Sequence, residues 1–278
     1  MPSFDTPQPL TADIAFEVGT VRIAAGKRTD TVVRVLPSDS AEEADVRAAE
    51  RTEVTCADGA LRIRGPRKRS PFGKAGSVDV TVHLPAGSDV TGTWPMADFH
   101  AEGRLGDCRL TTSFGDIRIE EAAAVTLRTG FGDIRVDRAS GDADVTGAGR
   151  VDIGEVTGTV TLRNANGETV LGEAGGDVRA DSSNGRITVG VAHAGVDARS
   201  GYGGIRIGDV ARGRVVLEAA AGALEVGVRE PAAAVLDVST RAGRIRDGVG
   251  GPEGTGRTPE TVRVRARTSA GDIVIRRP

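Results

Sequence analysis

The sequence predicts an all-β protein: a single-stranded parallel β-solenoid, or β-helix, with two main strands per turn of 17–18 residues. An irregular N-terminal cap that contains a short helix is expected to precede the regular turns. Three observations predict this fold. A unit of near-constant length recurs, apolar residues alternate with polar ones inside each unit, and small polar residues return at one position of almost every unit.

The repeat is most visible in "SFGDIRIEEAAAVTLRTGFGDIRVDRA", where "FGDIR" starts at Phe114 and again at Phe131. One glycine per unit aligns the chain, with successive intervals of 17, 17, 18, 18, 18, 19, 21 and 28 residues. A near-fixed period of this length is typical of a solenoid. The aligned glycines are Gly115, Gly132, Gly149, Gly167, Gly185, Gly203, Gly222, Gly243 and Gly271.

The first strand of each unit follows its glycine. The residues two and four positions later are mostly β-branched or Leu, which predicts a strand with one buried face. These inward pairs are Ile117/Ile119, Ile134/Val136, Val151/Ile153, Thr169/Leu171, Ile187/Val189, Ile205/Ile207, Leu224/Val226, Ile245/Asp247 and Ile273/Ile275.

A corner and a second strand complete the unit. Small apolar residues such as Ala122 and Ala139 fit the corner, and a second glycine, as at Gly158 and Gly176, supplies turn freedom. The second strand shows the same alternation, as in Val160/Leu162. Ala143 and Val145 fall one position late in their unit, which predicts a β-bulge over residues 141–149.

A column of small polar residues precedes the leading turn in most units. Because like residues of stacked parallel strands lie about 4.8 Å apart, these side chains are expected to hydrogen-bond to one another up the stack. The column is Thr112, Thr129, Thr146, Asn164, Ser182, Ser200, Ala219, Thr240 and Thr268.

An antiparallel barrel or sandwich is the alternative fold. "NANG" at Asn164 and "SSNG" at Ser182 contain Asn-Gly, which favours hairpins. The repetition of small corner residues in unit after unit favours the parallel coil.

Residues 1–100 repeat poorly and are predicted to form the irregular N-terminal β cap, followed by regular repeats over 101–278. Strands are expected around Val21 and Ile23, around Leu61 and Ile63, and in "VDVTVHL" from Val78. The insert "SDSAEEADVRAAERT" from Ser38 predicts a short helix with a serine N-cap. Solenoid ends need such caps because they expose core and strand edges.

Composition and charge exclude several classes of protein. The net charge of −3 and the alternating signs on outward strand positions exclude a uniform basic surface, so nucleic-acid binding is not expected. Two cysteines cannot form a disulfide framework. The segment "MPSFDTPQPL" has no basic start or apolar run, and no stretch approaches a membrane span, so a cytoplasmic protein is expected.

The strand "VDVTVHLPAGSDV" (Val78–Val90) and the serial "GDI" strands at Gly115, Gly132 and Gly271 resemble the bacterial putative-adhesin family, β-strand-repeat domains of unknown function. The resemblance covers most of the chain. It implies a β-helical fold and supplies no catalytic residues.

Candidate catalytic and metal-binding residues are sparse. His83 is expected to face solvent, and His100 and His193 to lie in turns far apart in sequence. Cys108 falls in an inward column and is expected to be a small buried hydrophobe. No catalytic, cofactor-binding or metal-binding residue is therefore predicted.

Two groups of charged residues have both a structural and a functional interpretation. Asp116, Asp133 and Asp272 resemble the carboxylates of polysaccharide-cleaving β-helices, but they recur with the repeat beside a turn. The one basic cluster, "GPRKRSPFGKAG", is either a solvated loop or a partner-docking loop carried by Arg67, Lys68, Arg69 and Lys74.

The sequence thus favours a non-enzymatic interaction or scaffold protein that binds a protein partner or itself. A self-assembling filament subunit similar to the bactofilins is the first alternative, and the cap over residues 1–100 argues against it. A carbohydrate-active β-helix enzyme is the second, and the scarcity of aromatic residues, 3%, argues against it.

Overall fold

The computed structural model describes residues 2–66, 75–249 and 261–278. The chain divides into two compact units, residues 1–140 and 141–278. The fold is all-β, as predicted, with one short helix in the described residues. The predicted boundary between residues 100 and 101 lies inside a strand of the first unit.

Where the structure describes it, the first unit contains twelve strands and the helix. They are β1 (Ser3–Asp5), β2 (Thr11–Ala15), β3 (Val18–Gly26), β4 (Asp30–Pro37), α1 (Glu43–Glu50), β5 (Glu53–Ala57), β6 (Ala60–Arg64), β7 (Ser77–Pro85), β8 (Asp89–Arg104), β9 (Asp107–Phe114), β10 (Ile117–Ala122), β11 (Ala124–Phe131) and β12 (Ile134–Ala139).

Both parallel and antiparallel pairs occur in the first unit. Strand β8 spans two rows: its first half pairs in parallel with β2 and β9, and its second half with β3 and β10. The regular turns begin here, with Ile117 opposite Ile134 and Val125 opposite Cys108. Antiparallel pairs β1–β4, β4–β7 and β5–β6 make the N-terminal part irregular, in agreement with the predicted cap.

The helix forms inside the predicted insert, but its cap differs from the prediction. Its N-cap residue is Glu42, which makes no side-chain capping bond. Ser38 instead bonds Ser77 and Asp79 of β7. The buried carboxylate of Asp45 accepts the backbone N–H of Ser77 at 2.8 Å, which ties the helix to the sheet.

The second unit contains only strands in its described residues. They are β13 (Ala143–Gly147), β14 (Val151–Val156), β15 (Val160–Asn166), β16 (Thr169–Ala174), β17 (Val178–Asn184), β18 (Ile187–Ala192), β19 (Val196–Tyr202), β20 (Ile205–Val210), β21 (Gly213–Ala221), β22 (Leu224–Val228), β23 (Ala233–Ala242), β24 (Ile245–Asp247), β25 (Thr261–Ala270) and β26 (Ile273–Arg276).

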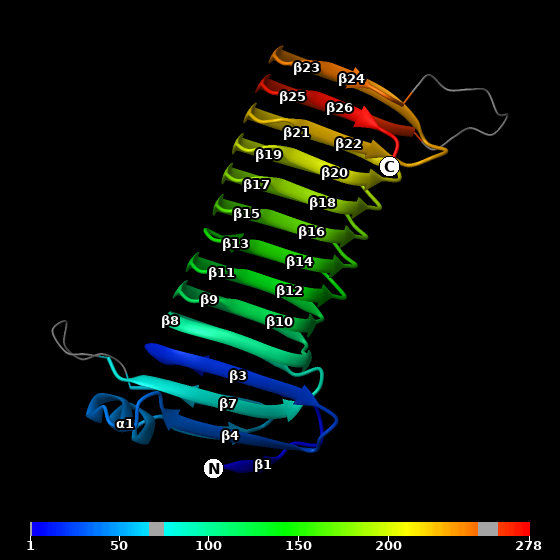
Figure 1. Ribbon diagram of the computed structural model, residues 1–278. Helices are drawn as coiled ribbons and strands as arrows, with labels where there is room; N and C mark the ends of the chain where they lie inside the picture. The colour runs from blue at the N-terminus through cyan, green and yellow to red at the C-terminus, as the bar shows by residue number, and fades with distance from the viewer. Residues whose placement is uncertain (1, 67–74, 250–260) are drawn as a thin grey trace. The chain divides into compact units, whose positions relative to one another are not determined.

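Every strand pair among the described residues of the second unit is parallel, so the antiparallel alternative is wrong there. Val160 lies opposite Val178, which lies opposite Val196, one repeat apart each time. The Asn-Gly pairs predicted to favour hairpins lie at corners between consecutive strands of the coil. Figure 1 shows the odd-numbered strands from β13 to β21 side by side, with the even-numbered strands in a matching row.

Strand order departs from chain order at the last turns. β25 pairs with β21, and β23 pairs with the other side of β25. The β25–β26 turn therefore lies between β21–β22 and β23–β24. Ile245, predicted to face inward, is 46% exposed because the β23–β24 turn has a neighbouring turn on one side only in the described structure.

The other first-strand assignments are confirmed: apart from Ile245/Asp247, both members of each predicted pair are buried, as are Val160 and Leu162 of a second strand. The second-strand pair Leu236/Val238, which the same alternation predicts to face inward, is only half-buried. The predicted bulge at 141–149 is wrong on the side that pairs with β15, where Ala143 to Gly147 match Val160 to Asn164 without a shift. Both strands begin two residues after a glycine, Gly141 and Gly158, so their registers agree.

The polar column is buried except at Thr146 and Thr240, which are half-buried. In the described structure the hydrogen bonds of its side chains run mainly to the backbone, not up the stack from one column residue to the next as predicted. Thr129 and Thr268 donate to the carbonyls of Gly115 and Gly222, each at 3.1 Å. Asn164 donates to the carbonyl of Gly149 at 2.9 Å. The corner glycines bring their carbonyls close to this column, so a side-chain ladder does not form there.

Candidate functional site

The residues of the predicted docking loop, Arg67, Lys68, Arg69 and Lys74, lie outside the described residues. Their assignment stays a prediction. The described residues that could carry function are therefore the histidines, the cysteines and the outward faces of the strands.

The histidines are not brought together. His83 is exposed on β7, as predicted. His100, predicted in a turn, lies within β8, where its Nε2 is 3.2 Å from Glu102 Oε1. His193 lies in a bend, and its Nε2 is 2.7 Å from Glu173 Oε1. In the described part of the chain no group of three or more His, Cys, Asp or Glu side chains could hold a metal ion.

Cys108 is a core residue, as predicted. Its side chain is 1% exposed. Burial, with smaller contributions from the charges of Asp89 and Asp107, raises the pKa of its thiol to about 12. A thiol with that pKa carries almost no thiolate at neutral pH and is a poor nucleophile.

The repeated aspartates stabilise the corners. Asp98 accepts the backbone N–H of Asp116, and Asp116 accepts that of Asp133, each at 2.9 Å. Asp272 accepts the N–H of Arg244 at 2.8 Å. Each carboxylate thus accepts a backbone donor from a neighbouring turn through a charge-assisted hydrogen bond, which gives these residues a structural role.

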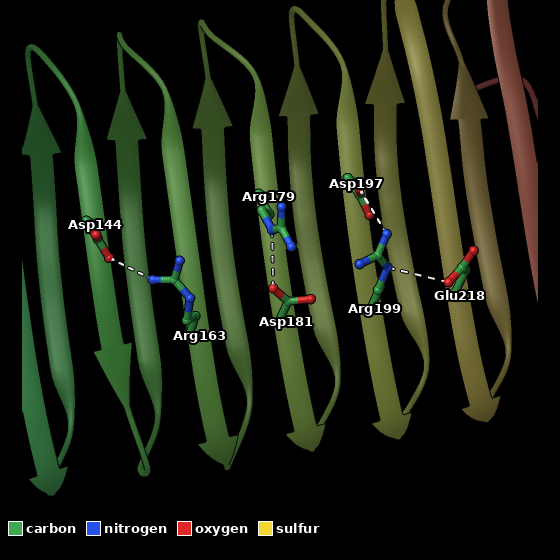
Figure 2. A network of polar contacts seen from close by, with 7 residues as sticks. All are labelled: Asp144, Arg163, Arg179, Asp181, Asp197, Arg199 and Glu218. Atoms are coloured by element: carbon green, nitrogen blue, oxygen red, sulfur yellow. Dashed lines mark hydrogen bonds and ion pairs between the residues drawn. The ribbon is translucent and has the colours of Figure 1, made fainter.

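The outward face of the odd-numbered strands in the second unit carries alternating charges. We call seven of these residues the charged lattice: Asp144, Arg163, Arg179, Asp181, Asp197, Arg199 and Glu218 (Figure 2). They lie on successive strands from β13 to β21, because outward residues of equivalent register stack.

Arg199 is the best-connected residue of the charged lattice. Its Nη2 is 3.3 Å from Asp197 two positions earlier, and its Nε is 3.4 Å from Glu218 on the next strand of the stack (Figure 2). Arg163 reaches Asp144 at 3.3 Å, also across strands, whereas Arg179 pairs with Asp181 of its own strand at 3.4 Å. Such exposed pairs each contribute only about 0–1 kcal/mol, so they can exchange partners at little cost.

A shallow trough runs beside the charged lattice. Its floor is a column of small residues, Ala165, Ser183, Gly201 and Ala220, which follow the buried polar column by one position. The hollow measures about 670 Å³, and Arg163, Asp181, Arg199 and Glu218 line its edge. A volume of this size is comparable with that of ligand pockets, although the trough is open along the face.

A second hollow of about 580 Å³ lies on the other side of the charged lattice. Thr161, Arg179, Asp197 and Val216 are among the residues that line it. The charged lattice is therefore a ridge between two grooves. The alternation of signs follows from the sequence, whereas neither groove was predicted. The Ala, Ser, Gly and Ala residues at one register position were the signal for the trough.

The first unit presents exposed aromatic residues. Phe114 and Phe131 are opposite each other on β9 and β11, with ring centroids 5.1 Å apart and an interplanar angle of 10°. They are 47% and 63% exposed, and the half-exposed Met96 lies opposite Phe114. Trp94, by contrast, is 1% exposed between Phe16 and Phe99.

No protein-family model matches this chain, and no curated protein matches it. Solved structures that match it include a putative adhesin from Bacteroides fragilis, at 14% identity and a TM-score of 0.38, covering 99% of this chain and 95% of the other. A putative adhesin from Parabacteroides merdae matches at 10% identity and a TM-score of 0.40, covering 98% and 94%.

A putative lipid binding protein from Parabacteroides distasonis matches at 10% identity and a TM-score of 0.28, covering 98% of this chain and 95% of the other. The adhesin names agree with the family that the sequence resembles. Within the described residues, no helix has the length and apolar character that a membrane-spanning helix needs.

Proposed function

We propose that the chain is a non-enzymatic binding protein that holds a protein partner on the charged lattice and its trough. One observation carries the proposal: a row of exposed, weakly paired charges of both signs borders an open groove with a floor of small side chains. The rigid stacking of strands fixes the spacing of these charges, so a partner with complementary charges could bind without reordering them.

The chemistry of the surface favours a polypeptide over other partners. Four carboxylates among the seven residues of the charged lattice would repel the phosphates of a nucleic acid. A polysaccharide site would be expected to offer aromatic platforms, but none of the residues that line the trough is aromatic. A segment of extended protein chain has both charge signs and can lie along a floor of Ala, Ser and Gly.

The polysaccharide-cleaving alternative is not favoured, because the repeated corner aspartates already accept backbone N–H groups. Incubation with a panel of polysaccharides followed by detection of new reducing ends tests it directly. The cytoplasmic location stays a prediction, which fractionation of the host cells would test.

Variants of the trough and the charged lattice test the proposal. Ser183→Trp with Ala220→Trp fills the trough, and Arg199→Glu reverses the charge that pairs with Asp197 and Glu218. All three positions are at the surface, so the variants should fold normally. Thr188→Trp, outward on β18 in the other row of strands, is the matched control.

Immobilised protein is exposed to host extract, and the captured proteins are quantified. We expect a reproducible partner that binds the parent protein and Thr188→Trp but binds the trough and Arg199→Glu variants at least about tenfold less, the loss typical of a contact worth 1.4 kcal/mol. Equal capture of every partner by all four proteins would contradict the proposal.

A further inference from the structure

Strand β23 leaves one edge without a partner in the described structure. It is ten residues long and pairs in parallel with β25 on one side only, from Ala233 opposite Thr261 to Ala242 opposite Ala270. No register shift interrupts this pairing, and no proline lies within the strand. Edges are normally protected by bulges, prolines, short length or charged side chains, lysine above all. Strand β23 has no bulge, proline or lysine, and its charged side chains are one of each sign, Asp237 and Arg241.

The core beneath this edge is open as well. Leu236 and Val238 point inward but are only half-buried, whereas the equivalent Val264 and Ala266 of β25 are buried. On the second strand of the same turn, Ile245 is 46% exposed, whereas the equivalent Ile273 of β26 is fully buried. One further turn would cover these side chains as the inner turns cover one another.

The free edge presents alternate backbone groups. The carbonyl of Ala242 accepts the N–H of Gly271, so even-numbered residues of β23 direct their backbone groups toward β25. Because successive residues of a strand point to opposite sides, the N–H and C=O groups of Asp237, Ser239 and Arg241 are directed toward the open edge.

This edge is complementary to itself. In an antiparallel pair with a two-fold axis at Ser239, that residue faces its own copy, and Asp237 of each chain faces Arg241 of the other. All of these residues have edge-directed backbone groups, so the register forms a regular hydrogen-bonded ladder. It also sets Val238 against Thr240 of the other copy, over the half-buried core.

The alternative two-fold registers lack this match. A two-fold axis at Asp237 would place the Asp237 carboxylates of the two copies opposite each other. An axis at Val238 would place Asp237 of one copy opposite Ser239 of the other. Asp237 lies 3.4 Å from Arg267 within its own chain, and no ion pair of Arg241 occurs among the described residues. Without an ion pair among the described residues, Arg241 lies at the position where the Ser239 register brings a carboxylate.

We propose that two copies of this chain associate through antiparallel pairing of their β23 edges about Ser239. The interface is isologous, so it closes at two chains and does not extend into a filament. The interface does not use the charged lattice, so a test of the dimer is independent of any test of the proposed partner site.

Sedimentation equilibrium or light scattering of the full chain over about a hundredfold concentration range measures the dimer constant. We expect a monomer–dimer equilibrium for the parent protein. Ser239→Pro removes an edge-directed N–H without breaking the ladder to β25 and should abolish the dimer. Ser239→Ala keeps that N–H and should leave the dimer constant unchanged.

Arg241→Glu replaces two attractive cross-strand pairs by repulsive ones and should weaken the dimer roughly tenfold or more. Arg128→Glu on β11, exposed in the other unit, is its charge control and should have no effect. Circular dichroism and melting verify that every variant is folded. A parent protein that stays monomeric at all concentrations, or a dimer that survives Ser239→Pro or Arg241→Glu, would overturn the proposal.

Discussion

The glycine before each first strand is set by contact between neighbouring turns. Gly115 and Gly132 have φ of 140° and 139°, a region that side-chain-bearing residues rarely adopt. A Cβ added at Gly132 would lie 2.2 Å from the carbonyl oxygen of Gly115. That same carbonyl accepts the hydroxyl of Thr129 at 3.1 Å, so the repeated glycine and the repeated threonine belong to one corner.

Gly132→Ala should therefore lower the free energy of unfolding by about 1–3 kcal/mol, because strain and a backbone clash act together. Gly26→Ala is the control, since a Cβ there meets no atom within 4 Å. Urea unfolding of both variants measures the difference. Equal stability of the two would show that the Gly115–Gly132 contact does not constrain the corner.

Cys108 should react with a thiol reagent only after unfolding, because its thiol is buried and its pKa is raised to about 12. Cys56, which is only partly buried, serves as the internal control. Mass spectrometry of the native protein after alkylation near pH 8 should find label on Cys56 alone. Equally rapid labelling of Cys108 in the folded protein would contradict its core position.

Asp142 supplies a pH-dependent contact. The backbone N–H and then the hydroxyl of Thr159 lower the pKa of its carboxyl group by hydrogen bonding to the ionised form. Its stabilising contribution is fully present above the unfolded-state pKa and is lost as the pH falls through the lowered folded-state pKa.

Asp142→Asn should therefore reduce the melting temperature near neutral pH, and the difference from the parent protein should shrink as the solution is acidified. Melting curves measured across this pH range provide the comparison. A difference that stays constant down to acidic pH would show that ionisation of Asp142 does not stabilise the fold.

The sequence predicts where the strands lie better than it predicts the order in which they stack. Alternation identified Ile205 and Ile207 as inward because a strand with one buried face requires period two. The repeat does not specify the order in which turns stack, because every turn offers a similar strand edge to its neighbours. The insertion of β25–β26 before β23–β24, and the exposure of Ile245, were therefore not predictable from period alone.

Ile205→Asp compares directly with Ile245→Asp, because both residues occupy the same position of their turns. Ile205 is 1% exposed, so an aspartate there buries an unpaired charge and should lower the free energy of unfolding by more than about 3 kcal/mol. Ile245→Asp should cost less than about 1 kcal/mol at an exposed site. Thermal melting of dilute protein tests both, and similar losses would refute the inward assignment of Ile205.

At the scale of the whole molecule, each unit is built of strands in which equivalent residues of successive turns lie opposite one another. The sequence predicted the alternating charges of the outward face, but not which of them pair. Arg199 bonds within its own strand and across to Glu218, whereas Arg179 bonds only Asp181 of its own strand among the described contacts. Side-chain rotamers and the neighbouring turn decide between these choices, and neither is encoded in the residue spacing.

Cross-linking of stacked positions tests the parallel coil most directly. In a chain with Cys56→Ser and Cys108→Ala, cysteines at Asn166 and Asn184 would occupy directly opposed positions of β15 and β17, about 4.8 Å apart and within disulfide range. Cysteines at Asn166 and Tyr202 would lie two turns apart, at about 9.6 Å, beyond that range. Mild oxidation should close the first pair within one chain and leave the second open. Failure of the first pair in folded protein, or equal closure of both, would contradict the parallel stacking on which this account of the protein depends.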